Sequence, residues 1–266
     1  TDRNRTSPFA FTGNKFEFRM VGSKDSVACP NMILNTIVAD AFSDFSDRLE
    51  KDNSEEAIKA LIKETFTNHQ RIIFNGDGYS DEWVEEAAKR KLLNLRTSAE
   101  AIPYYRKEEN VKLFEKHKVL SKDELESRTE VLLEDYSNVL SIEAKATIEM
   151  AKNAILPACI AYVKEVAETL QVKQAACPSA NNKVEEDTVV KVSDLNVKLY
   201  EAINELQKGL EEAESVQNAE QRAMAFKEKV FENMEEVRKY ADELETIVDK
   251  KFWPYPSYGE ILFSVQ

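Results

Sequence analysis

The sequence predicts a mainly α-helical protein, in which long helices form an antiparallel bundle after a short β element. Three observations support this fold class. Only 13 of the 266 residues are glycine or proline, about 5% against roughly 12% in average proteins. No glycine occurs between Gly78 and Gly209, so few turns are expected there. Apolar residues recur at spacings of three and four along several long segments, which is typical of amphipathic helices.

The first 24 residues differ from the rest of the chain. Residues 1–13 favour a loop, and residues 14–21 predict a strand because charged and apolar side chains alternate. One face of this strand carries Glu17 between Lys15 and Arg19. Such a face suits a site for anionic groups and a divalent metal. The same alternation is also typical of a solvated sheet face with cross-strand ion pairs.

Helical segments are predicted from here to residue 120. Helical spacing after Pro30 predicts a mostly buried helix to about Glu50. A second helix is predicted after Ser54, a suitable N-cap. A third follows Ser80, after a turn at residues 74–79. Residues 96–120 predict short helical pieces interrupted near Pro103.

A long helix is predicted from residue 121 to about residue 174. Ser121 and Glu124 fit a capping box, in which each side chain satisfies a free backbone N–H of the other residue. Pro157 lies inside this helix and should kink or divide it. Residues 177–182 then predict a mobile loop.

Two further long segments carry apolar stripes at helical spacing. The first stripe consists of Val192, Leu195, Leu199, Ile203, Leu206 and Leu210. The second consists of Phe226, Val230, Met234, Val237, Leu244 and Val248. Because an isolated helix is marginally stable, packing of these stripes should supply most of the stability. The tail at residues 252–259 holds two prolines, so it is predicted to be non-helical and packed on another part of the chain.

The charge is unevenly distributed. The net charge is −13, the first 24 residues sum to +3, and the other 242 residues therefore sum to −16. An acidic body disfavours non-specific binding to nucleic acid or anionic membrane, so neither partner is expected. No apolar run approaches the ~20 residues of a membrane span.

The cysteines and the first residue bear on the compartment of the protein and on whether the chain is part of a longer one. Three cysteines without a CxxC pair predict reduced thiols in a cytoplasmic protein. A zinc site is not expected, because only His69 and His117 are available to supplement them. The chain begins with Thr and no basic-then-apolar leader follows, so the chain is either processed or, as we expect, cut from something longer.

The stretch from Asn4 to Arg19 resembles the end of the catalytic domain of glutamine synthetases, in the version carried by the type III branch. The family's basic-apolar-Glu-apolar-Arg pattern matches residues 15–19, and its Asn-Arg-Ser pattern is found here as Asn4-Arg5-Thr6. Residues 8–12 lack an arginine of the common types, as in the type III branch. Residues 26–31 resemble the family's turn before a helix, and residues 252–260 resemble the type III C-terminus.

This resemblance implies the ATP-dependent ligation of ammonia to glutamate through a γ-glutamyl phosphate, with Mg²⁺ or Mn²⁺, for nitrogen assimilation. By resemblance, Glu17 would be a metal ligand next to the nucleotide phosphates. Arg19 would hold the glutamate side-chain carboxylate or the phosphoryl group. Lys15 would lie on the ATP side, and Arg5 would contact substrate or phosphate.

The resemblance also implies a domain organisation. Residues 1–50 would end the catalytic domain, residues 51–250 would form a helical C-terminal region, and residues 251–266 an extended aromatic and proline-rich tail. Active sites in this family form between subunits of a homo-oligomeric ring, and most ligands lie upstream, so the chain alone is expected to be inactive. The alternative is a non-catalytic helical assembly or regulatory module, because roughly three quarters of the chain carries stripes and no chemistry.

Overall fold

The computed structural model describes residues 9–11, 16–18, 26–78 and 80–263. The chain divides into two compact units, each of which is described by itself. The first unit comprises residues 1–96 and 104–127, and the second unit comprises residues 97–103 and 128–266. The described chain is mainly helical, as the sequence predicts. In this part of the chain, no helix combines the length and the apolar character that crossing a membrane requires.

Two strands and several helices precede residue 120. They are β1 (Phe9–Phe11), β2 (Phe16–Phe18), α1 (Ala28–Leu49), α2 (Glu55–Asn68), η1 (Gln70–Ile72), α3 (Asp81–Lys89), α4 (Ser98–Ala101), η2 (Ile102–Arg106) and α5 (Glu108–Lys116). The elements that follow are α6 (Lys122–Met150), η3 (Ala151–Ile155), α7 (Leu156–Ala176), α8 (Lys183–Glu214), α9 (Ala219–Ala225), η4 (Phe226–Phe231), α10 (Glu232–Glu245) and α11 (Tyr258–Leu262). Of the elements labelled η, the first two are 3-10 turns and the last two are π-helical turns.

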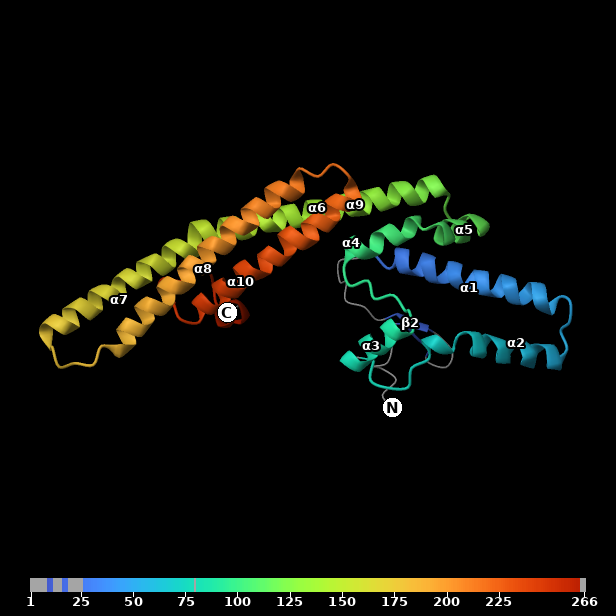
Figure 1. Cartoon of the computed structure of the whole chain (residues 1–266), viewed down its shortest axis with the longest axis horizontal. Helices are drawn as coiled ribbons and strands as arrows, with labels where there is room; N and C mark the ends of the chain where they lie inside the picture. Colours follow the sequence, from blue (N-terminus) through green and yellow to red (C-terminus); the bar gives the residue numbers. More distant parts are fainter. Residues whose placement is uncertain (1–8, 12–15, 19–25, 79, 264–266) are drawn as a thin grey trace. The chain divides into compact units, whose positions relative to one another are not determined.

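In the second unit, α8 packs against both α7 and α10 (Figure 1). Ion pairs between these helices show in which direction each helix runs relative to the other. Lys173 near the end of α7 lies 2.7 Å from Glu185 near the start of α8, whereas Lys145 of α6 lies 2.8 Å from Glu214 at the end of α8. The α6–α7 stretch and α8 are therefore antiparallel. The stretch from η4 to α10 is also antiparallel to α8. The end of α8 pairs with η4 through Glu212–Lys229, and the first part of α8 pairs with α10 through Lys191–Glu243.

A π-turn, η3, interrupts the long helical stretch between α6 and α7. Pro157 lies two residues after the end of this turn, in the first turn of α7. Proline has no backbone N–H and its ring crowds the carbonyl four residues earlier, so a regular α-helix does not continue unchanged through it. The departure from the regular α-helix falls in the wider π-turn, just before Pro157. The prediction that Pro157 divides the long helix is confirmed.

The two apolar stripes form most of the core of the second unit. All six residues of the α8 stripe are at most 5% exposed. In the second stripe, Phe226, Val230 and Leu244 are fully buried, and Met234 is partly buried. Ile155 and Cys159 from the α6–α7 stretch join the same cluster. The prediction that these stripes pack into a core is confirmed.

The absence of a side chain at Gly209 lets α8 approach η4 closely. A Cβ atom at this position would clash with the backbone carbonyl oxygen of Lys229. That oxygen accepts a hydrogen bond from Nδ2 of Asn233 at 2.7 Å, and the same amide lies 3.4 Å from the carbonyl oxygen of Glu205 on α8. The close approach is thus combined with a polar contact between the two helices.

The first unit has a smaller core. It consists of Val111, Phe114, Leu120 and Leu125, against which Met32, Ile33 and Tyr105 pack. Among the described residues of α1, only Thr36 is buried, so the prediction of a mostly buried helix is wrong. Apolar spacing favours the helix, but burial also needs a facing element, and Phe42 remains 65% exposed.

The predicted helix starts are confirmed. The hydroxyl of Ser54 accepts a hydrogen bond from the backbone N–H of Ala57 at 3.2 Å, and that of Ser80 accepts one from Trp83 at 3.4 Å. Each satisfies one backbone donor that the first helical turn leaves without an intrahelical partner. The short pieces predicted around Pro103 are α4, η2 and α5.

The aromatic tail packs on the core of the second unit, as the sequence predicts. Phe252, Trp253 and Tyr255 are partly buried against this core. The ring of Phe252 lies 5.7 Å from that of Tyr162, centroid to centroid. The tail therefore belongs structurally to the second unit.

The end of the tail differs from the sequence prediction. Residues 252–259 are predicted to be non-helical, yet α11 begins at Tyr258. Ser257 and Glu260 form a complete capping box at its start. The helix starts after Pro256, so the proline does not interrupt it. The Ser-x-x-Glu spacing is the sequence signal for this helix.

Candidate functional site

Of the four predicted site residues, only Glu17 lies in a segment that the structure describes, the strand β2. β1 and β2 pair antiparallel, and Glu17 is opposite Ala10 in the register. Residues 9–11, expected in a loop, form β1. Arg5, Lys15 and Arg19 lie outside the described residues. The four-residue site and its assignment to the end of a catalytic domain therefore stay predictions.

The described residues do not assemble a metal site by themselves. Within residues 9–11, 16–18, 26–78 and 80–263, no group of three or more His, Cys, Asp or Glu side chains is arranged to hold an ion. The prediction for Glu17 concerns a strand whose side-chain placement is not described.

A charged cluster connects α1 and α5 in the first unit. One carboxylate oxygen of Asp40 lies 2.7 Å from Nζ of Lys116 and 2.8 Å from Nε2 of His117. Lys116 also reaches Asp44 at 3.3 Å. Hydrogen bonds from Lys116 and then His117 lower the pKa of Asp40. Because these groups are partly exposed and satisfy each other, their simplest role is to fix α5 on α1.

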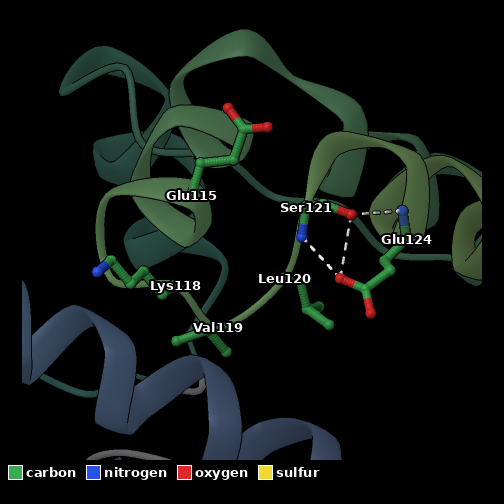
Figure 2. Close-up of a pocket in the computed structure, with 6 residues that line it drawn as sticks. All are labelled: Glu115, Lys118, Val119, Leu120, Ser121 and Glu124. Atoms are coloured by element: carbon green, nitrogen blue, oxygen red, sulfur yellow. Dashed lines mark hydrogen bonds between the residues drawn. The ribbon is translucent and has the colours of Figure 1, made fainter.

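A tight corner joins α5 to α6 and borders a small, open hollow of about 290 Å³, whose lining residues are drawn in Figure 2. Lys118 has a left-handed backbone, with φ of 55°, which turns the chain sharply. The backbone N–H and the hydroxyl of Ser121 donate to Glu124 at 2.8 and 3.1 Å, and the backbone N–H of Glu124 donates back to the hydroxyl at 3.3 Å. These bonds confirm the predicted capping box. The polar groups of Ser121 and Glu124 therefore cap the first turn of α6.

A larger cavity of about 680 Å³ lies in the second unit, and we call it the tail cavity. Four parts of the chain line it: the end of α6, the turn η3, the stretch η4–α10 and the tail. Its apolar and aromatic lining consists of Ala146, Met150, Ala151, Ile155, Phe231, Met234, Val237, Ala241, Trp253, Tyr255, Pro256 and Ile261. Its polar lining consists of Glu143, Thr147, Glu235, Arg238, Asp242 and Glu245.

The charge around the tail cavity is unbalanced. Arg238 Nε lies 3.2 Å from a carboxylate oxygen of Asp242, so this pair is neutral overall. Glu143, Glu235 and Glu245 form no ion pair with any residue that the structure describes. The tail cavity is open to solvent and combines an apolar lining with three exposed carboxylates that form no ion pair among the described residues.

The three cysteines are free thiols in different surroundings. Cys159 is buried, and burial raises the pKa of its thiol to about 11. A hydrogen bond with the Ser179 hydroxyl lowers the pKa of the exposed Cys177. Sγ of Cys29 lies 2.9 Å from the Tyr105 hydroxyl oxygen.

Sequence reasoning did not predict the tail cavity. Its lining comes from residues as far apart as Glu143 and Ile261, and no local motif brings them together. The aromatic residues of the tail were the available signal, since they predicted packing. The sequence does not show where the tail packs or that space remains beneath it.

Part of the chain matches a known protein family. Residues 57–174 match the family described as "Glutamine synthetase C-terminal domain". This segment runs from α2 to near the end of α7, and so includes parts of both units.

Curated relatives are similar along nearly the whole chain. The chain is 40% identical over 273 residues to the type-3 glutamine synthetase of Dictyostelium discoideum, covering 99% of this chain and 37% of that protein. It is 38% identical over 271 residues to a glutamine synthetase of Butyrivibrio fibrisolvens, covering 100% of this chain and 38% of the relative. A glutamine synthetase of Bacteroides fragilis is 34% identical over 274 residues, covering 99% of this chain and 37% of the relative. The chain thus spans little more than a third of the length of these relatives.

Proposed function

Because the chain belongs to the type-3 glutamine synthetase family, we propose that the protein containing it ligates ammonia to glutamate with consumption of ATP, giving glutamine for nitrogen assimilation. One observation carries this proposal. Three glutamine synthetases are 34 to 40% identical to this sequence, and each alignment covers at least 99% of the chain. Such an extended similarity covers nearly the whole chain and is not confined to one segment of it.

Four residues are proposed for the site. Glu17 binds Mg²⁺ or Mn²⁺ next to the nucleotide phosphates, and Lys15 lies on the ATP side. Arg19 holds the glutamate side-chain carboxylate or the phosphoryl group, and Arg5 contacts substrate or phosphate. The metal, when bound, neutralises charge on phosphate oxygens. The guanidinium groups suit these anions because their donors match carboxylate and phosphate oxygens in pairs.

The assembly and compartment are part of the same proposal. We propose a homo-oligomeric ring in the cytoplasm, and no activity for this chain alone. The free thiols support a reducing compartment. The chain covers only 37 to 38% of each relative. This supports the lack of independent activity, because the family resemblance implies that most of the ligands lie outside the segment.

The test is the substitution Glu17→Gln in the full-length protein. It removes the metal-binding charge with little change in size. We expect glutamine formation to fall at least about 100-fold, because even residues that only orient metal ligands contribute 10- to 100-fold. The oligomer should stay intact by light scattering. The matched control is Glu56→Gln on the exposed surface of α2. Activity of E17Q within twofold of the parent would contradict the assignment.

A second candidate function is a helical assembly or regulatory module. The observation that favours it is the separate core of the second unit, which the bundle helices and the tail build together. Deleting residues 128–266 from the full-length protein should change the oligomer or its control while Glu17 remains. Unchanged kinetics and assembly after this deletion would exclude both roles for the second unit.

A further inference from the structure

The tail cavity carries an inference that is independent of the ligase reaction. We propose that the tail cavity binds a small organic cation, such as a primary ammonium group on an apolar or aromatic body. Three properties of the cavity support this class of ligand: its size, its apolar lining and the sign of its charge.

The size of the cavity fits a small molecule. Cavities that hold drug-sized ligands are usually about 300–1,000 Å³, and the tail cavity is about 680 Å³. A docked protein partner usually buries about 800 Å² of each surface, which requires a more extended face. Size therefore favours a compact ligand over a helix or a folded partner.

The lining fits an apolar body. Val237 and Ala151 are 1% and 2% exposed and belong to the core of the second unit, so they give the cavity a fixed floor. Met150, Phe231 and Ile261 are each at least 45% exposed although they line the cavity. A ligand that covered these side chains would remove apolar surface from water.

The negative charge of the cavity lining favours a cationic ligand. Glu143, Glu235 and Glu245 line the cavity as exposed side chains without an ion pair among the described residues. Arg238 is paired with Asp242. An anionic ligand would meet three like charges, and a neutral ligand would leave them unchanged. A cation is attracted to them. It also gains from the faces of aromatic rings such as Trp253, which attract cations at short range.

Three probes that share one apolar body but differ in charge show how much charge contributes to binding. They are 4-phenylbutylammonium, 4-phenyl-1-butanol and 4-phenylbutyrate. Binding to the whole 266-residue chain is measured by calorimetry, and by the fluorescence of Trp253 in a Trp83→Phe background, since the chain holds two tryptophans. We expect the ammonium to bind about tenfold more tightly than the alcohol, and the carboxylate to bind least. The difference should shrink in 1 M salt.

Two sets of variants locate the site. The triple variant E143Q/E235Q/E245Q should weaken ammonium binding about tenfold, while E130Q/E134Q/E201Q, which changes exposed glutamates outside the cavity, should not. Ala146→Trp should block the cavity at an exposed position of α6, so it should not disturb the core. Ala161→Trp on the exposed surface of α7 is its control.

The outcomes either support the proposal or overturn it. Binding that prefers the ammonium and is lost in both cavity variants supports it. Equal affinity for the ammonium and the alcohol would overturn the role of the carboxylates. Ammonium binding that survives Ala146→Trp would place the site elsewhere, and an absence of ammonium binding would exclude a cation site.

Discussion

The helices of the first unit and those of the second unit have similar apolar spacing but differ in burial. In α8, every residue of the predicted stripe is buried, because α7 and α10 pack against that helix. In α2, Leu61 is buried but Phe66 is 63% exposed. Periodicity therefore predicts the helix in both units, whereas burial depends on whether another element faces the stripe. Four predictions test this difference, from the largest expected effect to the smallest.

The largest effect is expected for Phe226→Ala in the second unit. Phe226 is fully buried in η4, and truncating a buried phenylalanine usually costs about 3–5 kcal/mol of unfolding free energy. The matched variant Phe66→Ala in the first unit should change stability by less than about 0.5 kcal/mol, because that ring is largely exposed.

The two tryptophans allow each unit to be followed separately in urea. Trp83 reports on the first unit and Trp253 on the second unit, after replacement of the other by Phe. F226A should shift the transition that Trp253 reports. A similar loss of stability in F226A and F66A would show that the difference in burial has no energetic consequence.

A smaller effect is expected for Gly209→Ala. The added Cβ would clash with the carbonyl oxygen of Lys229, so the helices must separate, at a cost of about 1–3 kcal/mol. Gly259→Ala in α11 is the control, since its Cβ would lie 3.9 Å from Oγ of Ser257, an ordinary contact. Alanine should even stabilise α11 by up to about 1 kcal/mol. Thermal unfolding of both variants distinguishes them, and equal melting temperatures would argue against the close approach at Gly209.

The cap of α6 should contribute less. Ser121→Ala removes the hydroxyl that accepts from the backbone N–H of Glu124, and we expect a loss of about 1 kcal/mol in urea unfolding. Ser121→Asp keeps an acceptor and should retain most of the stability. If S121D loses as much stability as S121A, the hydroxyl has a role other than capping.

The smallest effect is expected for the pH dependence of the tail. Hydrogen bonds from Lys250 and then Ser257 lower the pKa of Glu260 to about 2. A lowered carboxyl pKa contributes stability above the ordinary value of 4.5, and this contribution is lost as the pH falls from 4.5 towards 2. NMR titration should therefore show a low pKa for Glu260, which Lys250→Met raises. An unchanged pKa in K250M would contradict the ion pair.

Part of the fold was predictable because its signals are local. The hydroxyls of Ser54, Ser80 and Ser121 are placed one turn before the donors that they accept from, so their roles follow from spacing alone. Pro157 likewise acts on its own helical turn. The candidate sites were less predictable from local signals. The proposed catalytic residues came from a resemblance, and the tail cavity was not predicted.

The sequence by itself determined the helical class, the helix starts, the break before Pro157 and the stripes of the second unit. These features depend on hydrogen bonds and side-chain contacts within a few residues, which spacing describes directly. Only the tertiary structure decided which stripes are buried, where Gly209 is required and how the tail comes to line a cavity. Each of these depends on the distance between residues that are remote in sequence, and that distance is set by packing of the whole unit.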